Sequence, residues 1–371
     1  MEIVLLVVAL AVILLGAELF TNGIEWFGHK LNLAEGAVGS VLAGIATAMP
    51  ETLIPVIAIV GPTLSGSPAG TSAEIGVGAI LGAPFMLSTL AMFVTGGAVV
   101  IFARRGRRST VMSVNRRVVT RDLLFFAGAY GLAIGAAFVP SELAPIRWAV
   151  AAVLVVAYAA YVRAHFADEA GAGDSADLNR LHATRIPIGR LGRSLELDLL
   201  PVGHQPLMAV ETPHLRIIVL QVMVAFALIL IGAQIFVGAV EHIAASIQID
   251  PRILALIIAP IATELPEQSN SVLWTRASKD TLAIGNVTGA MVFQSCLPTV
   301  LGILLTDWRF GPDTALAFGS AAFAFVSLGL IFAVARRAGR LTGWMMLIGG
   351  PIYLVYVALA LLLPAGGAVL H

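Results

Sequence analysis

The sequence has 371 residues, of which 58% are hydrophobic and 12% charged, and its 22 basic and 22 acidic residues give a formal net charge of zero. A soluble globular protein of this composition would have too few polar residues to cover its surface, so the composition excludes that class and indicates an integral membrane protein. The single cysteine, Cys296, excludes an intrachain disulfide and a thiolate-rich metal site.

Apolar segments of roughly 20 residues or more predict α-helices that cross a hydrocarbon core about 30 Å thick, rather than the strands of a barrel. The first segment has neither a basic region before it nor a small-residue cleavage site, so we expect it to remain as a transmembrane helix. We expect ten spans, at residues 1–22, 33–60, 72–103, 122–141, 145–163, 214–240, 251–273, 281–306, 312–335 and 341–366.

The basic residues predict how these spans are oriented. In a ten-span arrangement, 19 of the 22 Lys and Arg residues fall on one side of the membrane, and only Arg147, Arg252 and Arg309 fall on the other. Short cytoplasmic loops retain Lys and Arg, so the basic side is expected to be cytoplasmic. This arrangement predicts a multi-pass protein of the cell membrane with both termini outside the cytoplasm.

One long polar connection, residues 164–213, divides the chain into an N-terminal half at 1–163 and a C-terminal half at 214–371. We expect this connection to be a polar cytoplasmic loop. Each half has five expected spans, and because five is odd, the second half enters the membrane from the opposite face. The expected fold is therefore an all-α integral membrane protein with ten transmembrane helices in two inverted five-helix repeats.

Two short motifs recur in the same order in both halves. Thr-x-x-Pro-Glu occurs at 47–51 in the second span and at 263–267 in the seventh, and Gly-x3-Gly occurs at 78–82 in the third span and at 285–289 in the eighth. Gly-x3-Gly alone is a common packing device in membrane helices. The occurrence of both motifs at matching spans favours an internal repeat, with an alpha-repeat in each half.

The prolines of the first motif predict breaks in two membrane helices. Pro50 and Pro266 lack an N–H, so each is expected to leave a backbone carbonyl, that of Ala46 or Ala262, without its helical partner. Unpaired backbone groups at bilayer depth are tolerated where they line a polar cavity. The motif therefore predicts such a cavity in each half.

The carboxylates of Glu51 and Glu267 and the hydroxyls of Thr47 and Thr263 are expected near these carbonyls. Oxygen atoms of these kinds are the ligands that Ca²⁺ prefers, about six to eight of them. Glu264 lies three residues before Glu267 and would add a third carboxylate on the same helix face. Such acidic groups repel one another when the site is empty, so they would bind a cation or take up protons.

At these motifs the sequence resembles the cation/calcium exchanger superfamily, and within it the prokaryotic sodium/calcium exchanger membrane proteins. That family has ten spans in two inverted halves, each with Gly-Thr-Ser-x-Pro-Glu followed by Gly-Asn-x-x-Gly-Ser. The resemblance implies that the carboxylates of Glu51 and Glu267 bind the transported cation and that Thr47 and Thr263 line the site.

The chain departs from the family motifs at several polar positions, which removes oxygen ligands expected for Na⁺. Asn286 keeps the family asparagine in the second half, and Gln294 stands where the family commonly has Asn or Asp. The departures are Ala46 and Ala262 for glycine, Ala48 and Glu264 for serine, Ala79 for asparagine, Ala83 and Ala290 for serine, and Leu87 for Asn or Asp.

We therefore expect a secondary active antiporter, not an enzyme, that exchanges Ca²⁺ against Na⁺ or H⁺ by alternating access. Its expected partners are small inorganic cations, as substrates, and the lipid bilayer, with no nucleic acid and no resident cofactor; the sequence does not predict an oligomeric state. The expected metal ligands are Glu51, Glu267, Thr47, Thr263, Glu264, Asn286 and Gln294.

Three alternatives remain open from the sequence. In the first, the protein is an antiporter for another monovalent or divalent cation. In the second, it is a non-transporting relative with a decayed ion site, an alternative that Ala79, Ala83 and Leu87 suggest. A third alternative, an intramembrane hydrolase with two carboxylates, is disfavoured because the predicted spans lack Gly-x-Gly-Asp and the sequence lacks His-Glu-x-x-His.

Overall fold

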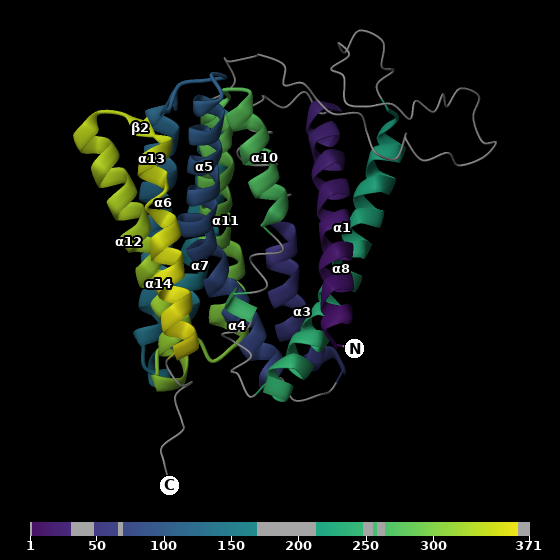
Figure 1. The fold of residues 1–371 in the computed structure, drawn as a ribbon. Helices are drawn as coiled ribbons and strands as arrows, with labels where there is room; N and C mark the ends of the chain where they lie inside the picture. Colours follow the sequence, from purple (N-terminus) through teal and green to yellow (C-terminus); the bar gives the residue numbers. More distant parts are fainter. Residues whose placement is uncertain are drawn as a thin grey trace, which may run out of the picture.

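The computed structural model describes residues 2–30, 48–65, 70–168, 213–247, 255–257 and 264–362, and nearly all of them are helical (Figure 1). The helices of the first half are α1 (Glu2–Lys30), α3 (Met49–Ser65), α4 (Gly70–Met86), the π-helix η2 (Leu87–Ala91), α5 (Met92–Arg104), α6 (Arg116–Gly135) and α7 (Ala144–Asp168). Those of the second half are α8 (Leu215–Ile247), α10 (Leu265–Arg276), α11 (Asp280–Leu305), α12 (Ala315–Ala338), α13 (Gly343–Met346) and α14 (Gly349–Leu362). Short elements complete the described chain: the 3-10 helices η3 (Ala136–Phe138), η4 (Ser141–Leu143) and η6 (Pro312–Thr314), and the strands β1 (Val111–Met112) and β2 (Leu341–Thr342).

Eight segments of the described residues are long and apolar enough to cross a membrane. They correspond to eight of the ten expected spans, so the expected all-α, multi-pass membrane protein is confirmed. The other two expected spans, 33–60 and 251–273, are described mainly in their later parts, where α3 and α10 lie. The number of ten spans stays a prediction.

Several helices extend beyond the predicted spans: α1 runs to Lys30 and α8 to Ile247, past the predicted ends at 22 and 240. Two further differences lie next to the basic segments. Helix α6 begins at Arg116 and not at residue 122, because the side chain of Asn115 accepts hydrogen bonds from the N–H groups of Arg117 and Val118 and caps the helix. Helix α7 continues to Asp168, five residues into the predicted polar loop, since the buried His165 keeps this last turn packed against the bundle.

Helices α1 and α8 lie side by side at one edge of the bundle (Figure 1). A Cβ atom on Gly16 would lie 2.8 Å from Cγ1 of Ile229, and one on Gly232 would lie 2.7 Å from Cγ1 of Ile13. Gly232 follows Gly16 by 216 residues, and Ile229 follows Ile13 by the same number. Glu267 also follows Glu51 by 216 residues. The two helices thus make the same close contact from both sides.

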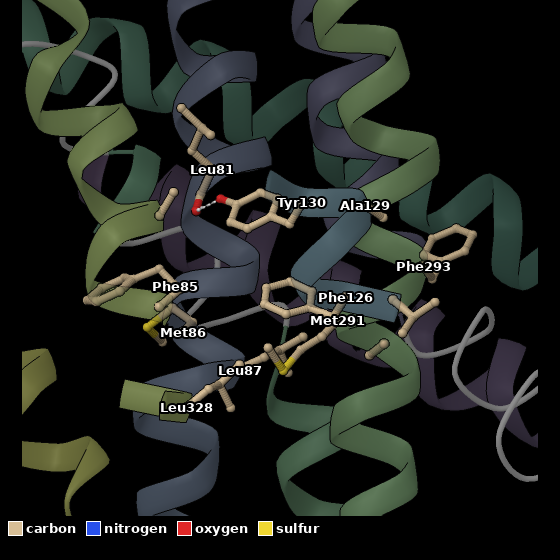
Figure 2. Close-up of a cluster of buried hydrophobic side chains, with 14 of the residues drawn as sticks. Leu81, Phe85, Met86, Leu87, Phe126, Ala129, Tyr130, Met291, Phe293 and Leu328 are labelled. Atoms are coloured by element: carbon tan, nitrogen blue, oxygen red, sulfur yellow. Dashed lines mark hydrogen bonds between the residues drawn. The ribbon is translucent and has the colours of Figure 1, made fainter. Parts of the chain in front are cut away.

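Two long helical segments run through the middle of the remaining bundle. Helix α11 packs against α6 and α7, whereas α4 and η2 pack against α12, and η2 also packs against α14. Figure 2 shows the apolar core between them, in which the Tyr130 hydroxyl donates a hydrogen bond to the carbonyl of Leu81 at 3.5 Å. The labelled core residues are Leu81, Phe85, Met86, Leu87, Phe126, Ala129, Tyr130, Met291, Phe293 and Leu328.

One end of the bundle, here called the basic end, is where α5 ends, α6 begins, α10 meets α11 and α12 ends. Helix α1 begins and α14 ends at the opposite end (Figure 1). The short strands β1 and β2 pair antiparallel at the basic end. Its described basic residues are Arg104, Arg105, Arg107, Arg108, Arg116, Arg117, Arg276, Lys279, Arg336, Arg337 and Arg340.

A buried ion pair fixes the start of α11 at the basic end. The guanidinium of Arg108 donates to both carboxylate oxygens of Asp280, at 2.7 and 2.9 Å, and to the carbonyl of Thr275 at 2.7 Å. The N–H of Ser113 donates to the same carboxylate at 2.8 Å. The side chains of Arg108 and Asp280 are 2% and 3% exposed, so the pair joins the segment after α5 to the turn between α10 and α11.

Candidate functional site

Helices α3 and α10 both begin at the Pro-Glu motif. The residues before them, Ala48 and Glu264, are in turns, and Pro50 and Pro266 are the second residues of their helices. A proline costs little there, because the first N–H groups of a helix have no intrahelical partner. The prolines therefore stand at helix starts rather than inside α3 and α10. The carbonyls of Ala46 and Ala262, predicted to be freed, lie outside the described residues.

The two helix starts have the same first backbone hydrogen bond. The N–H of Thr52 donates to the carbonyl of Ala48 at 3.2 Å, and the N–H of Gln268 donates to the carbonyl of Glu264 at 2.9 Å. The start of each helix lies near the middle of the bundle, from which α3 extends toward one end and α10 toward the basic end (Figure 1). This antiparallel pair of half-length helices is the centre of the candidate site.

Carboxylates occur at both helix starts. Glu51 lies in the first turn of α3 and is 4% exposed, and Glu264 lies directly before α10 and is 1% exposed. The N-terminal end of a helix carries a partial positive charge, which stabilises a nearby carboxylate. Glu267 lies in the first turn of α10. Its side chain, together with Thr47 and Thr263, lies outside the part of the chain that the structure describes in side-chain detail.

Helix α11 brings polar groups to α10. Asn286 is 1% exposed, and its Nδ2 donates to Oγ of Ser271 on α10 at 3.4 Å. The Ser271 hydroxyl in turn donates to the carbonyl of Ala283 on α11 at 3.2 Å. The structure therefore places Asn286 beside α10, two turns beyond Glu264, while α11 also contacts α3.

Gln294, further along α11, is also 1% exposed, and within the described residues neither atom of its amide group has a hydrogen-bond partner. The same holds for the half-buried amide of Gln268, one turn after Glu264. Buried amides without partners cost about 1–3 kcal/mol each, so their retention is consistent with a polar ligand that is bound only part of the time.

Among the described residues, no three His, Cys, Asp or Glu side chains gather to hold a metal ion. The side chain of Glu267 is not among them. A cation held here would take its oxygens from carboxylates and amides of at least three helices, α3, α10 and α11.

Several polar groups near the site were not predicted from the sequence. Gln268 and Ser271 follow the motif on α10, and Tyr353 of α14 lies close enough to Glu264 for the two groups to interact electrostatically. Polar residues inside an apolar span were the available signal for Gln268 and Ser271. No comparable signal marked Tyr353, because only the packing of α14 brings it there.

The π-helix η2 was also missed. It begins at Leu87, where the resembled family commonly has Asn or Asp, and its hydroxyls of Ser88 and Thr89 donate to the carbonyl of Phe85 at 2.8 and 2.6 Å. Segments of π-helix often occur at functional sites. In this half of the molecule, however, the hydroxyls satisfy the backbone of their own helix.

Comparisons with known proteins agree with this architecture. The fold matches the crystal structure of the H⁺/Ca²⁺ exchanger CAX with a TM-score of 0.67 and 14% identity, over 97% of this chain and 86% of that one. It also matches the sodium–calcium exchanger NCX_Mj with a TM-score of 0.58 and 16% identity, over 96% of this chain and 98% of that one. A comparison with curated proteins found no significant match.

The match in sequence decides the family. The pattern of the sodium/calcium exchanger proteins covers residues 1–166 and 217–362, which is most of both halves and includes every candidate site residue. The resemblance expected from the two motifs is thus confirmed, and the chain belongs to the sodium/calcium exchanger protein family.

Proposed function

We propose that this protein is a secondary antiporter that exchanges Ca²⁺ against Na⁺ or H⁺ by alternating access. The observation that carries the proposal is the pair of half-length helices, α3 and α10, which begin near mid-depth with a Pro-Glu motif and with buried carboxylates at Glu51 and Glu264. Transporters of this general design bind ions at broken helices near the bilayer midplane.

The fold is proposed to be ten spans in two inverted repeats, with the basic end in the cytoplasm. The reciprocal contact of Gly16 and Gly232 supports the repeat, because it shares the 216-residue offset of the Pro-Glu motifs. The matching helix contacts support it too, since α3 packs on α4 and α11 while α10 packs on α11 and α5.

The proposed ligands are Glu51 and Glu267 at the centre, with oxygens from Thr47 and Thr263, and with Glu264, Asn286 and Gln294 setting selectivity. A bound cation would neutralise the carboxylates, and the neutral site would then pass between its two orientations at lower cost than the charged one. This difference prevents an empty, charged carrier from crossing and so enforces exchange.

Ca²⁺ is proposed as the substrate because the two structures reported above are calcium exchangers, CAX with H⁺ and NCX_Mj with sodium. The counter-ion is proposed as Na⁺ or H⁺. Ala79, Ala83 and Leu87 offer no side-chain oxygens from the third span, and a proton, unlike Na⁺, needs only a carboxylate.

The test is uptake of Ca²⁺ into proteoliposomes under an outward Na⁺ gradient and, separately, under an outward H⁺ gradient. We expect uptake under at least one gradient, and its loss when an ionophore collapses that gradient. Folded protein that takes up no Ca²⁺ under either gradient would contradict the proposal. Ca²⁺ binding without any flux would instead support the alternative of a non-transporting relative.

A further inference from the structure

A second buried carboxylate lies away from the candidate cation site. Asp122 of α6 is fully buried, and its two oxygens accept hydrogen bonds from the hydroxyls of Tyr161 on α7 and Thr288 on α11, both at 2.8 Å. Nε2 of His165 on α7 lies 3.8 Å from the same carboxylate, and His165 is also fully buried. Three side chains from two other helices thus surround the carboxylate of Asp122.

This cluster and the cation site lie on different faces of α11. Successive residues of an α-helix are rotated by about 100°, so Asn286 and Thr288 point in directions about 200° apart. Asn286 accordingly contacts α10, whereas Thr288 contacts α6. The cluster is therefore separate from the candidate cation site but shares a helix with it.

The charge of the cluster depends on a proton. From α7 the titratable groups that face Asp122 are His165 and Tyr161, and from α11 the only such polar neighbour in the described contacts is the Thr288 hydroxyl. On α6 itself, the neighbouring Arg121 acts on Asp122 electrostatically. One proton, held by either Asp122 or His165, makes this pair neutral overall, and intramembrane carboxylate–histidine groups commonly carry protons for this reason.

The hydrogen bonds fit both protonation states. A hydroxyl has one proton, yet Oγ1 of Thr288 lies 2.8 Å from the carboxylate of Asp122 and 3.1 Å from the carbonyl of Ile284. With Asp122 ionised, Thr288 donates to the carboxylate. With Asp122 protonated, the carboxyl donates to Thr288, whose own proton turns to Ile284. Asp122 can therefore gain or lose its proton while its oxygen and the Thr288 hydroxyl stay paired with each other.

The outer face of α6 extends from the basic end to the level of the cluster. A recess of about 780 Å³ there is lined by Arg116, Arg117, Thr120, Arg121, Leu124 and Phe125. The ring of Phe125 packs against that of Tyr161, with centroids 4.8 Å apart. One residue of this open surface, Phe125, is thus in contact with the cluster.

We propose that Asp122 and His165 form a proton-binding site, separate from the cation site, through which the pH at the basic end controls cation exchange. Its effect on exchange rests on the proposed antiport function. The ionised carboxylate accepts charge-assisted hydrogen bonds, which are about twice as strong as neutral ones, and so holds α11 more firmly against α6 and α7. Protonation weakens this hold on the helix that carries Asn286.

The proton site itself is tested on purified protein without any transport. Infrared difference spectra between about pH 8 and about pH 5, the range in which histidine titrates, report the protonation of individual carboxyl groups. We expect one carboxyl band of the wild type to be absent in Asp122→Asn and shifted in Tyr161→Phe. Tyr356→Phe, which removes a buried hydroxyl bonded to the Leu316 carbonyl, is the matched control and should keep the band unchanged.

The control of exchange is tested by the dependence of the initial flux on pH at the basic end. We expect Asp122→Asn to lose at least half of the wild-type change in rate between about pH 8 and about pH 5, and His165→Gln to shift the midpoint of that change. Unchanged profiles in both variants, or an unchanged carboxyl band in Asp122→Asn, would overturn the proposal. Absence of flux in the wild type would instead count against the antiport function, and the infrared result would still decide the proton site.

Discussion

The motif helices of the two halves are alike, but the long central helices that follow them are not. Helices α3 and α10 begin with the same Pro-Glu motif and the same first backbone hydrogen bond. Aligned on Gly78 and Gly285, Ala79 and Leu87 of the third span stand opposite Asn286 and Gln294 of α11. The half-length helices α3 and α10 thus share their motif and their first hydrogen bond. Side-chain oxygens, in contrast, occur at these two aligned positions only in the second half.

The faces of α11 and α4 that are turned away from the candidate site also differ in their polar contacts. Thr288 of α11 is aligned with Leu81 of α4, and Thr288 is bonded to the carboxylate of Asp122. The carbonyl of Leu81 accepts instead from the neutral hydroxyls of Tyr130 and Ser320. Polar side chains therefore gather around α11 on both of its faces. Two segments that begin with the same motif can thus be followed by helices with different polar contacts.

The largest effect is expected where the halves are alike. Glu51→Gln and Glu267→Gln each keep the size of the side chain but remove a charge that a cation must neutralise. We expect each to lower the initial rate of exchange by about 100-fold or more, since a lost charged contact is worth about 3 kcal/mol. Initial ion flux in proteoliposomes measures this.

Glu18→Gln, at an exposed position on α1, is the matched control and should retain the wild-type rate. If only one of the two motif variants loses exchange, the carboxylates do not act as a pair, and the comparison between α3 and α10 breaks down.

The helical membrane fold and the family could be predicted from the sequence. Apolar length predicted helical spans, and the Thr-x-x-Pro-Glu repeat predicted the exchanger family, which is confirmed. With the family it is also confirmed that the protein is a transporter and not an enzyme. These features depend on local composition and on short motifs, both of which are visible in one sequence.

What was missed depends on contacts between distant segments. Asp122 was placed at the edge of a predicted span, because the helix cap at Asn115 that moves this edge by six residues was not recognised. Its partners Tyr161 and Thr288 lie 39 and 166 residues away in the sequence. The π-helix η2 likewise has no signature in composition. The roles of Glu51, Glu267 and the other candidate ligands stay predictions.

The next effect concerns the ion pair that anchors the start of α11. Arg108→Met leaves the carboxylate of Asp280 buried with the Ser113 N–H as its remaining hydrogen-bond donor among the contacts described above. Removing one partner of a buried ion pair costs about 3–5 kcal/mol. We expect a marked fall in the thermal unfolding temperature of the detergent-solubilised protein. Arg107→Met, at an exposed position, is the control, and an equal fall in that variant would show that the loss is not specific to the pair.

A smaller effect tests the polar character of α11 directly. Gln294→Leu gives α11 the residue that the third span has at Leu87, and it removes a buried amide with no partner in the described residues. We expect cation affinity, measured by calorimetry, to fall about 10-fold, or about 1.4 kcal/mol. The cation-free protein should become slightly more stable, because an unsatisfied buried group is lost. A loss of stability without a loss of affinity would make Gln294 a packing residue.

The smallest effect concerns the contact that the two halves share without change. A methyl group on Gly16 would meet Ile229 at 2.8 Å and the carbonyl oxygen of Ala225 at 3.0 Å, and one on Gly232 would meet Ile13 at 2.7 Å and that of Ala9 at 3.1 Å. Overpacking costs about 1–3 kcal/mol, and the higher helix propensity of alanine returns up to about 1 kcal/mol.

We therefore expect Gly16→Ala and Gly232→Ala to lower the unfolding temperature modestly and by similar amounts. Gly128→Ala, which has open space around it, should have no such cost. Because the two contacts mirror each other, clearly unequal losses would show that α1 and α8 are no longer equivalent, and that the divergence seen in α11 extends to the edge of the bundle.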